Sequence, residues 1–114
     1  MSYSPDAFRA IVRVVLQQMD ARHPGMWSRS AEELLMLTSA HESHLGRWLT
    51  QQGGGVALGV YQQQPADLLD CYRYLERRTD IAETVLMVTG HDKPSLIALQ
   101  YDPVYSTAMA RVHY

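Results

Sequence analysis

The stretch SPDAFRAIVRVVLQQM, residues 4–19, carries the helical periodicity from which we infer the fold class. Serine followed by proline is typical of an N-cap and the first helical position. Apolar residues then recur at intervals of three and four, as on one face of a helix: Phe8, Ile11, Val12, Val15, Leu16 and Met19. The sequence HPG at 23–25 stops this pattern, so we predict an amphipathic helix from Ser4 to about His23.

A second helix is predicted to follow a short connection. Ser30 and Glu33 have the S-x-x-E spacing of a capping box, in which each side chain binds a free backbone N–H at the helix start. Gly46 is a typical helix stop. The residues expected to form the buried stripe of this helix are Leu34, Leu37, His41 and Leu45.

The rest of the chain also predicts helices, after one glycine-rich segment. Residues 50–62, TQQGGGVALGVYQ, read as a short glycine-rich loop or a small β-ribbon. One helix is expected to begin at Pro65, and another at Thr79 or Asp80, with a stop at Gly90. Pro94 is expected to begin a short turn of helix. The last helix is expected to begin at Asp102-Pro103 and to run to Tyr114. We therefore predict a single, mainly α domain over residues 1–114.

Composition limits the classes of function. With 46% hydrophobic and 19% charged residues, the chain of 114 residues is expected to be globular. A net charge of -2 does not suggest nucleic-acid binding. No apolar run approaches the roughly 18 residues that a transmembrane helix needs, so membrane insertion is not expected. The N-terminus, MSYSPDAFRA, lacks the features of a secretory signal, and Cys71 alone cannot form an internal disulfide, which together favour synthesis in a reducing cytoplasm.

The segment His41-Glu42-Ser43-His44 contains the candidate chemistry. A zinc-protease helix needs histidines four positions apart, whereas these two are three apart and no third ligand follows in any motif. We predict no metal and no cofactor, and we expect His41 to be a partly buried residue of the apolar stripe.

Glu42 is the candidate general acid. On a helical wheel it lies beside Leu35 and Thr38, at the flank of the predicted apolar stripe. Partial burial raises the pKa of a carboxyl group, as glycoside cleavage requires of its acid. The alternative interpretation is an ordinary solvated glutamate near a helix end.

Two motifs together resemble a known family. Glu42-Ser43 at a helix end is followed, 15 positions after Glu42, by the run ALGVYQQQPA at 57–66. This combination resembles the catalytic domain of soluble lytic transglycosylases and goose-type lysozymes, and the glycine-rich form of the loop is similar to lysozyme-like proteins encoded by bacteriophages. The resemblance covers about residues 30–66, and helix 103–114 is similar to the family's later helix beneath the cleft.

The resemblance implies cleavage of the peptidoglycan glycan strand between N-acetylmuramic acid and N-acetylglucosamine, by a lysozyme or a lytic transglycosylase. Glu42 would protonate the glycosidic oxygen, and Ser43 would orient nearby groups or substrate. The residues implied to contact or line the sugar site are Ser43, Gly59, Val60, Tyr61 and Gln62. Asp67 and Asp70 are candidates for a second carboxylate, although first-turn helix charges explain both.

Two departures from the family bear on function. The family's later tyrosine-asparagine motif is missing, which suggests that a C-terminal part of the fold, and with it one cleft wall, is absent. The missing signal peptide suggests a phage protein carried in the virion or released through a holin pore, acting at the cell wall. The alternative function is therefore a lysozyme-fold protein without turnover: a structural or glycan-binding component of a phage particle, or a truncated remnant.

Overall fold

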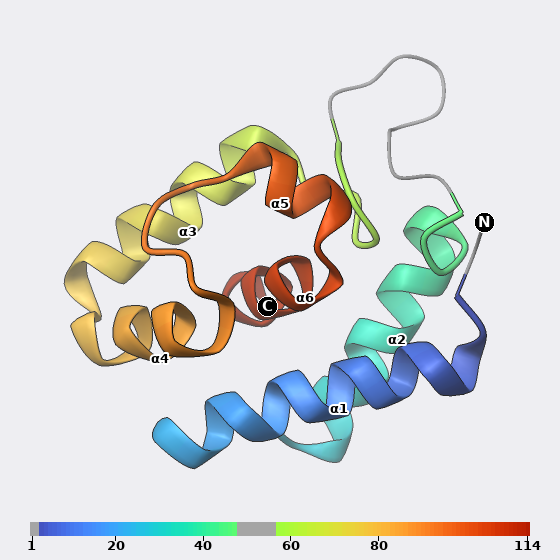
Figure 1. The fold of residues 1–114 in the computed structure, drawn as a ribbon, viewed down its shortest axis with the longest axis horizontal. Coiled ribbons are helices and arrows are strands. Elements are labelled where there is room, and N and C mark those ends of the chain that lie inside the picture. The colour runs from blue at the N-terminus through green and yellow to red at the C-terminus, as the bar shows by residue number, and fades with distance from the viewer. Residues whose placement is uncertain (1–2, 48–56) are drawn as a thin grey trace.

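The computed structural model describes residues 3–47 and 57–114, and six helices make up most of these two ranges (Figure 1). They are α1 (Pro5–Arg22), α2 (Arg29–Ser43), α3 (Pro65–Arg77), α4 (Thr79–Thr89), α5 (Leu96–Tyr101) and α6 (Pro103–His113). The described residues contain no strand and one isolated antiparallel bridge, between Leu58 and Gln63. The prediction of a mainly α chain is confirmed. The predicted loop at Gly53–Gly55 lies outside the described residues.

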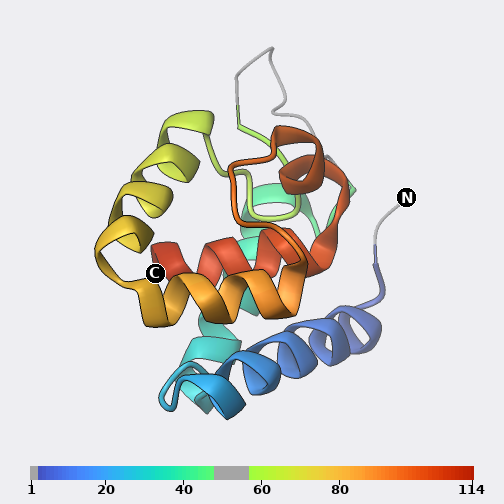
Figure 2. The same cartoon turned by 60° about the vertical axis from the view of Figure 1, so that its left-hand side comes forward.

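Helix α6 occupies the middle of the molecule and packs against all five other helices (Figures 1 and 2). Every residue from Tyr105 to Ala110 is buried. Four of these six side chains are small, and small side chains let neighbouring helices approach closely: Ser106, Thr107, Ala108 and Ala110. Helix α1 contributes the largest apolar face against this centre, and its buried residues are those predicted except Ile11, which is half-buried: Phe8, Val12, Val15, Leu16 and Met19.

Side-chain caps explain where several helices begin. The Ser4 hydroxyl accepts a hydrogen bond from the Ala7 N–H at 3.2 Å, and the Asp102 carboxylate accepts from Val104 N–H at 2.9 Å. These caps confirm the predicted starts of α1 and α6. Gly90, with φ of 78°, ends α4 as predicted, because glycine adopts left-handed backbone without a steric penalty.

The predicted start of α2 was wrong by two positions. Ser28, not Ser30, caps this helix, and its hydroxyl accepts from the Ala31 N–H at 3.0 Å. Ser30 lies inside the first turn. Glu33 does not reach back to the helix start, because its carboxylate pairs with Arg9 of α1 at 2.7 Å.

The buried face of α2 also differs from the predicted stripe. Leu34 and Leu37 are 45% and 68% exposed, and His41 is exposed as well. The buried residues are instead Glu32, Leu35, Met36, Ser39 and Ser43. Three of these five are polar, so a count of apolar residues alone selected the wrong face. The expectation that His41 is partly buried was wrong for the same reason.

Glu32 is buried because arginines from α1 neutralise it. Its side chain is 2% exposed and accepts hydrogen bonds from Arg9 Nη1 at 2.7 Å and from Arg13 Nε and Nη2, both at 2.8 Å. The Trp27 indole N–H donates to the same carboxylate at 3.1 Å. This network ties α1 to α2 and fixes which face of α2 meets the core.

None of the helices in the two described ranges is both long and apolar enough to span a bilayer.

Candidate functional site at the end of helix α2

Helix α2 ends in three consecutive residues with left-handed backbone. His44, Leu45 and Gly46 have φ of 51°, 56° and 86°. The Leu45 N–H returns to the Ser39 carbonyl oxygen at 3.1 Å, the long-range bond of a Schellman-type helix end. The helix therefore stops at Ser43, before the predicted stop at Gly46, and the chain turns sharply directly after Glu42-Ser43.

Ser43 connects this helix end to the second motif. Its side chain is fully buried, and its hydroxyl oxygen accepts a hydrogen bond from the Gly46 N–H at 3.0 Å. The hydroxyl lies in donor position against two carbonyl oxygens, those of Ser39 and Val60. The contact with Val60 joins residues 17 positions apart in the chain. Ser43 thus orients neighbouring groups by holding the 57–63 turn against α2.

The turn itself is closed by backbone hydrogen bonds. Leu58 N–H donates to the Gln63 carbonyl at 2.8 Å, and Gln63 N–H donates back at 3.0 Å. Gly59 has φ of 80°, and a Cβ at this position would lie 2.1 Å from the Leu99 carbonyl oxygen of α5. Only glycine fits here, because both the backbone angle and the space exclude a side chain. The close backbone approach at Gly59 is therefore made to α5.

Tyr61 is part of the core. It is 2% exposed, its hydroxyl lies 2.9 Å from Thr107 Oγ1 of α6, and burial raises the pKa of its phenol. Tyr61 is among the residues implied to line the sugar site, but it is buried, because the turn folds inward onto the small residues of α6. Gln62, with φ of 51°, is half-buried, and its amide N–H donates to the Gly59 carbonyl at 2.9 Å.

Glu42 is exposed on the last turn of α2. The expected partial burial was wrong, because the core-facing stripe passes through Ser39 and Ser43, and Glu42 lies about 100° around the helix from Ser43. Among the residues that the structure describes, none forms a hydrogen bond or ion pair with its carboxylate. Glu42 is thus open to solvent and to ligands.

Two carboxylates, those of Glu42 and Asp67, act electrostatically on Tyr114. Partial burial raises the pKa of Tyr114, and the charges of Glu42 and Asp67 raise it further, so both acids are within electrostatic range of this phenol. Asp67 also accepts a hydrogen bond from the Gln64 N–H at 3.1 Å and so caps α3. Glu42 at the end of α2 and Asp67 at the start of α3 thus both influence Tyr114, which follows α6.

Gln63 is the polar residue that the sequence did not single out. It is 3% exposed, and neither its Oε1 nor its Nε2 has a hydrogen-bond partner among the described residues. The run QQQ at 62–64 offers three equivalent side chains, and only the bridge to Leu58 determines which of them is buried.

The two histidines of the opening segment, His41 and His44, are both exposed. Within residues 3–47 and 57–114, no three histidine, cysteine or acidic side chains come together in a group that could hold a metal ion.

Comparisons with protein-family models, with curated proteins and with solved structures find no match to this chain.

Proposed function

We propose that this chain cleaves the glycan strand of bacterial peptidoglycan, as a lysozyme or lytic transglycosylase, with Glu42 as the general acid. The observation that carries the proposal is the contact between the Ser43 hydroxyl and the Val60 carbonyl. It joins the two motifs of the family resemblance, Glu-Ser and ALGVYQQQPA, which are separate in the sequence. Lysozyme-like architecture and a role for a phage protein at the cell wall or in the virion belong to the same proposal.

Accessibility of the acid supports this function. Glu42 is exposed directly beside the buried Ser43, so a glycosidic oxygen can reach the carboxyl while the turn stays anchored. A general acid must first come within about 3 Å of the oxygen that it protonates. Asp67 is close enough to interact electrostatically with the same phenol as Glu42, which makes it the candidate second carboxylate. Contacts of Gly59, Val60 and Gln62 with a sugar stay predictions.

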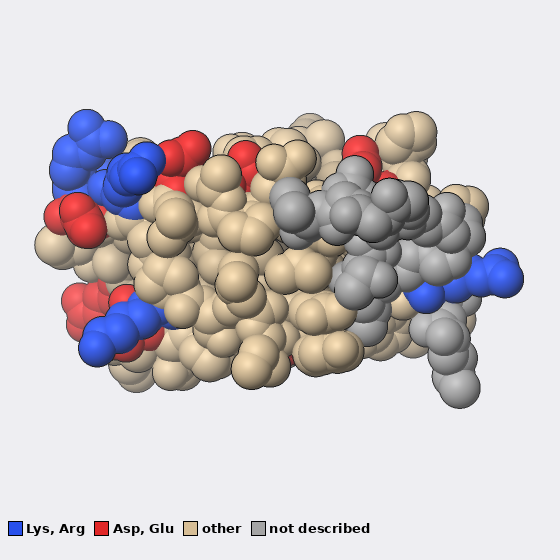
Figure 3. Space-filling view, turned by 90° about the horizontal axis from the view of Figure 1, so that it is seen from above, with Lys and Arg blue, Asp and Glu red and all other residues tan. Residues whose placement is uncertain are grey.

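The face of the molecule that Figure 3 shows suits a polymer of sugars. In Figure 3, residues other than Lys, Arg, Asp and Glu cover most of the middle of the face, basic side chains lie at its two ends, and acidic side chains lie at one end and along one long edge. Helix α5 has no charged residue, and Ile97 and Tyr101 on it are 76% and 64% exposed. Exposed aromatic rings beside uncharged surface are typical partners of sugar rings.

A second candidate function is glycan binding without turnover, as a structural component of a phage particle. The exposure of Glu42 favours it, because the general acid of a glycosidase usually lies in a partly apolar pocket.

Clearing of purified peptidoglycan tests the two functions. Wild type should reduce turbidity, Glu42→Gln should not, and Asp6→Asn, which removes an exposed carboxylate from α1, should behave as wild type. Equal activity of wild type and Glu42→Gln would remove Glu42 as the acid. Sedimentation with peptidoglycan but no clearing by wild type would instead establish the binding function. A reducing end or a 1,6-anhydro ring on the product distinguishes hydrolysis from transglycosylation.

A further inference from the structure

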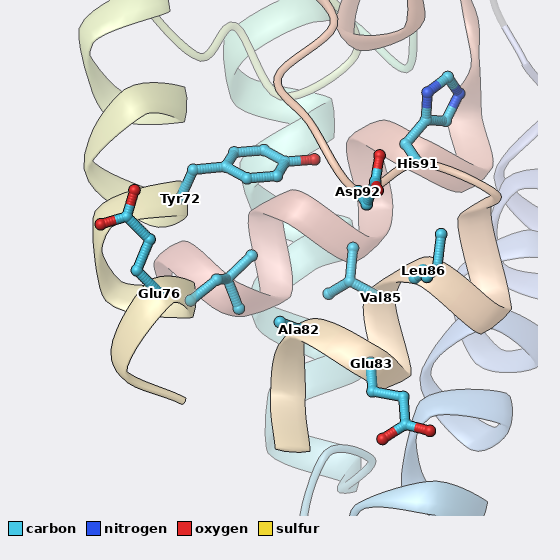
Figure 4. A pocket seen from close by; sticks show the side chains of 9 residues that line it. Tyr72, Glu76, Ala82, Glu83, Val85, Leu86, His91 and Asp92 are labelled. Carbon is cyan, nitrogen blue, oxygen red and sulfur yellow. The ribbon is translucent and has the colours of Figure 1, made fainter. Parts of the chain in front are cut away.

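A separate pocket lies between α3 and α4 and is closed by the segment that joins α4 to α5 (Figure 4). Its volume is about 280 Å³. The inner wall is apolar: Leu75 and Val85 are 3% and 1% exposed, and Ala82 is half-buried beside them. Ligand pockets usually start at about 300 Å³, so this space suits one ring with a short chain.

One end of the pocket is polar. The Tyr72 hydroxyl lies 2.8 Å from that of Tyr105, and the Ser95 N–H donates to the Tyr105 oxygen at 3.3 Å. A hydroxyl oxygen has two lone pairs and one proton. Whichever tyrosine donates in this pair, at least one lone pair of Tyr72 stays available to a further donor. In Figure 4 this hydroxyl points toward Asp92.

The surroundings of the pocket are negatively charged. Glu76 of α3, Glu83 of α4 and Asp92 after α4 line it, and in Figure 4 the Glu76 and Glu83 carboxylates point outward from the space between the helices. Within the described part of the chain, none of the three carboxylates has an ion-pair or hydrogen-bond partner. His91 packs edge-on against the Tyr105 ring at 4.8 Å between centroids. Lys93 follows Asp92 in the chain but does not line the pocket. An apolar wall under unpaired carboxylates is complementary to a cation with an apolar body.

We propose that this pocket binds a small organic cation, an alkyl- or arylammonium compound. Its apolar part packs on Leu75, Ala82 and Val85, and its ammonium group donates hydrogen bonds to the Asp92 carboxylate and the Tyr72 oxygen. The Asp92 carboxylate repels an organic anion of the same shape. A neutral molecule of that shape gains only the apolar contact. This binding is independent of the function proposed for Glu42.

Titration of the isotope-labelled full chain with phenethylammonium chloride tests the proposal, with amide shifts in NMR spectra as the measurement. We expect saturable shifts at Tyr72, Ala82 and Asp92, with a Kd of about 1 mM, as for a ligand of this size. The neutral analogue 2-phenylethanol should bind about three- to fivefold more weakly, and 3-phenylpropionate should cause no saturable shift.

Two variants connect the binding to this pocket. Asp92→Asn should weaken phenethylammonium binding about three- to fivefold, whereas Asp6→Asn, which removes an exposed carboxylate from α1, should leave it unchanged. Asp92 is exposed, so its replacement is not expected to affect folding. Equal binding of the ammonium compound and the alcohol would overturn the proposal. So would unchanged affinity in Asp92→Asn, or no saturable shift with wild type up to about 20 mM.

Discussion

Replacement of Glu32 by glutamine should be among the most destabilising single changes on α2. The carboxylate is 2% exposed and binds Arg9, Arg13 and the Trp27 indole. Glutamine keeps the shape of the side chain but turns one of its two acceptor oxygens into a donor that faces arginine N–H groups. The substitution therefore removes the charge and breaks the paired hydrogen bonds without creating a cavity.

The pKa of Glu32 sets the size of this effect. Hydrogen bonds from Arg13 above all, and from Trp27 and Arg9, lower this pKa from 4.5 to about 2, against the opposing effect of burial. A difference of ~2.5 pKa units corresponds to about 3.4 kcal/mol of stability at neutral pH. Arg13 is 51% exposed, so solvent screens part of this interaction, and we expect about 2–3 kcal/mol.

Chemical denaturation at several pH values measures this effect. Because the folded-state pKa is lowered, the stabilisation is fully present above pH 4.5 and is lost as pH falls toward 2. Wild type should lose free energy of unfolding over that window more steeply than Glu32→Gln. Glu33→Gln is the control: Glu33 also pairs with Arg9, but its side chain is 47% exposed, and its loss should cost less than about 1 kcal/mol. Equal effects of the two substitutions, or parallel pH curves for wild type and Glu32→Gln, would refute the reasoning.

Three further changes test other parts of the structure. Gly59→Ala should lower the free energy of unfolding by at least about 2 kcal/mol in urea, because its Cβ would lie 2.1 Å from the Leu99 oxygen at a φ of 80°; a smaller loss would mean that the turn does not pack on α5. In the same assay, Leu35→Ala should lower the free energy of unfolding by about 2–5 kcal/mol, and Leu37→Ala by less than about 1 kcal/mol. The reverse order would mean that Leu37, as the sequence predicted, faces the core. Burial raises the pKa of Cys71 to about 11, so the folded chain should resist alkylation by iodoacetamide at pH 8 while the denatured chain reacts; rapid native labelling would contradict this burial.

Local signals in the sequence predicted the helices, because caps and stops act over a few residues. Ser4, Asp102 and Gly90 each mark a boundary that depends only on nearby backbone groups. The orientation of α2 could not be predicted in this way. It depends on Glu32 meeting two arginines 19 and 23 positions earlier, and an apolar pattern treats a glutamate as exposed.

The candidate site was predicted in part for a similar reason. Glu42-Ser43 and the following turn were selected by motif and spacing, and the structure brings Ser43 and Val60 into contact. Their burial could not be read from the sequence, because it depends on how α6 and α5 pack around the turn. Tyr61 is the clearest case: its partner Thr107 is 46 positions away.

The central position of α6 has a consequence for how the protein is made. All five earlier helices pack on this helix, yet it is the last of the six to leave the ribosome. Until residues 103–113 emerge, α1 to α5 lack the helix that all five of them contact, so the six-helix core can form only after α6 has been synthesised. Before that point the nascent chain relies on local helix formation, and its apolar helix faces are exposed to water.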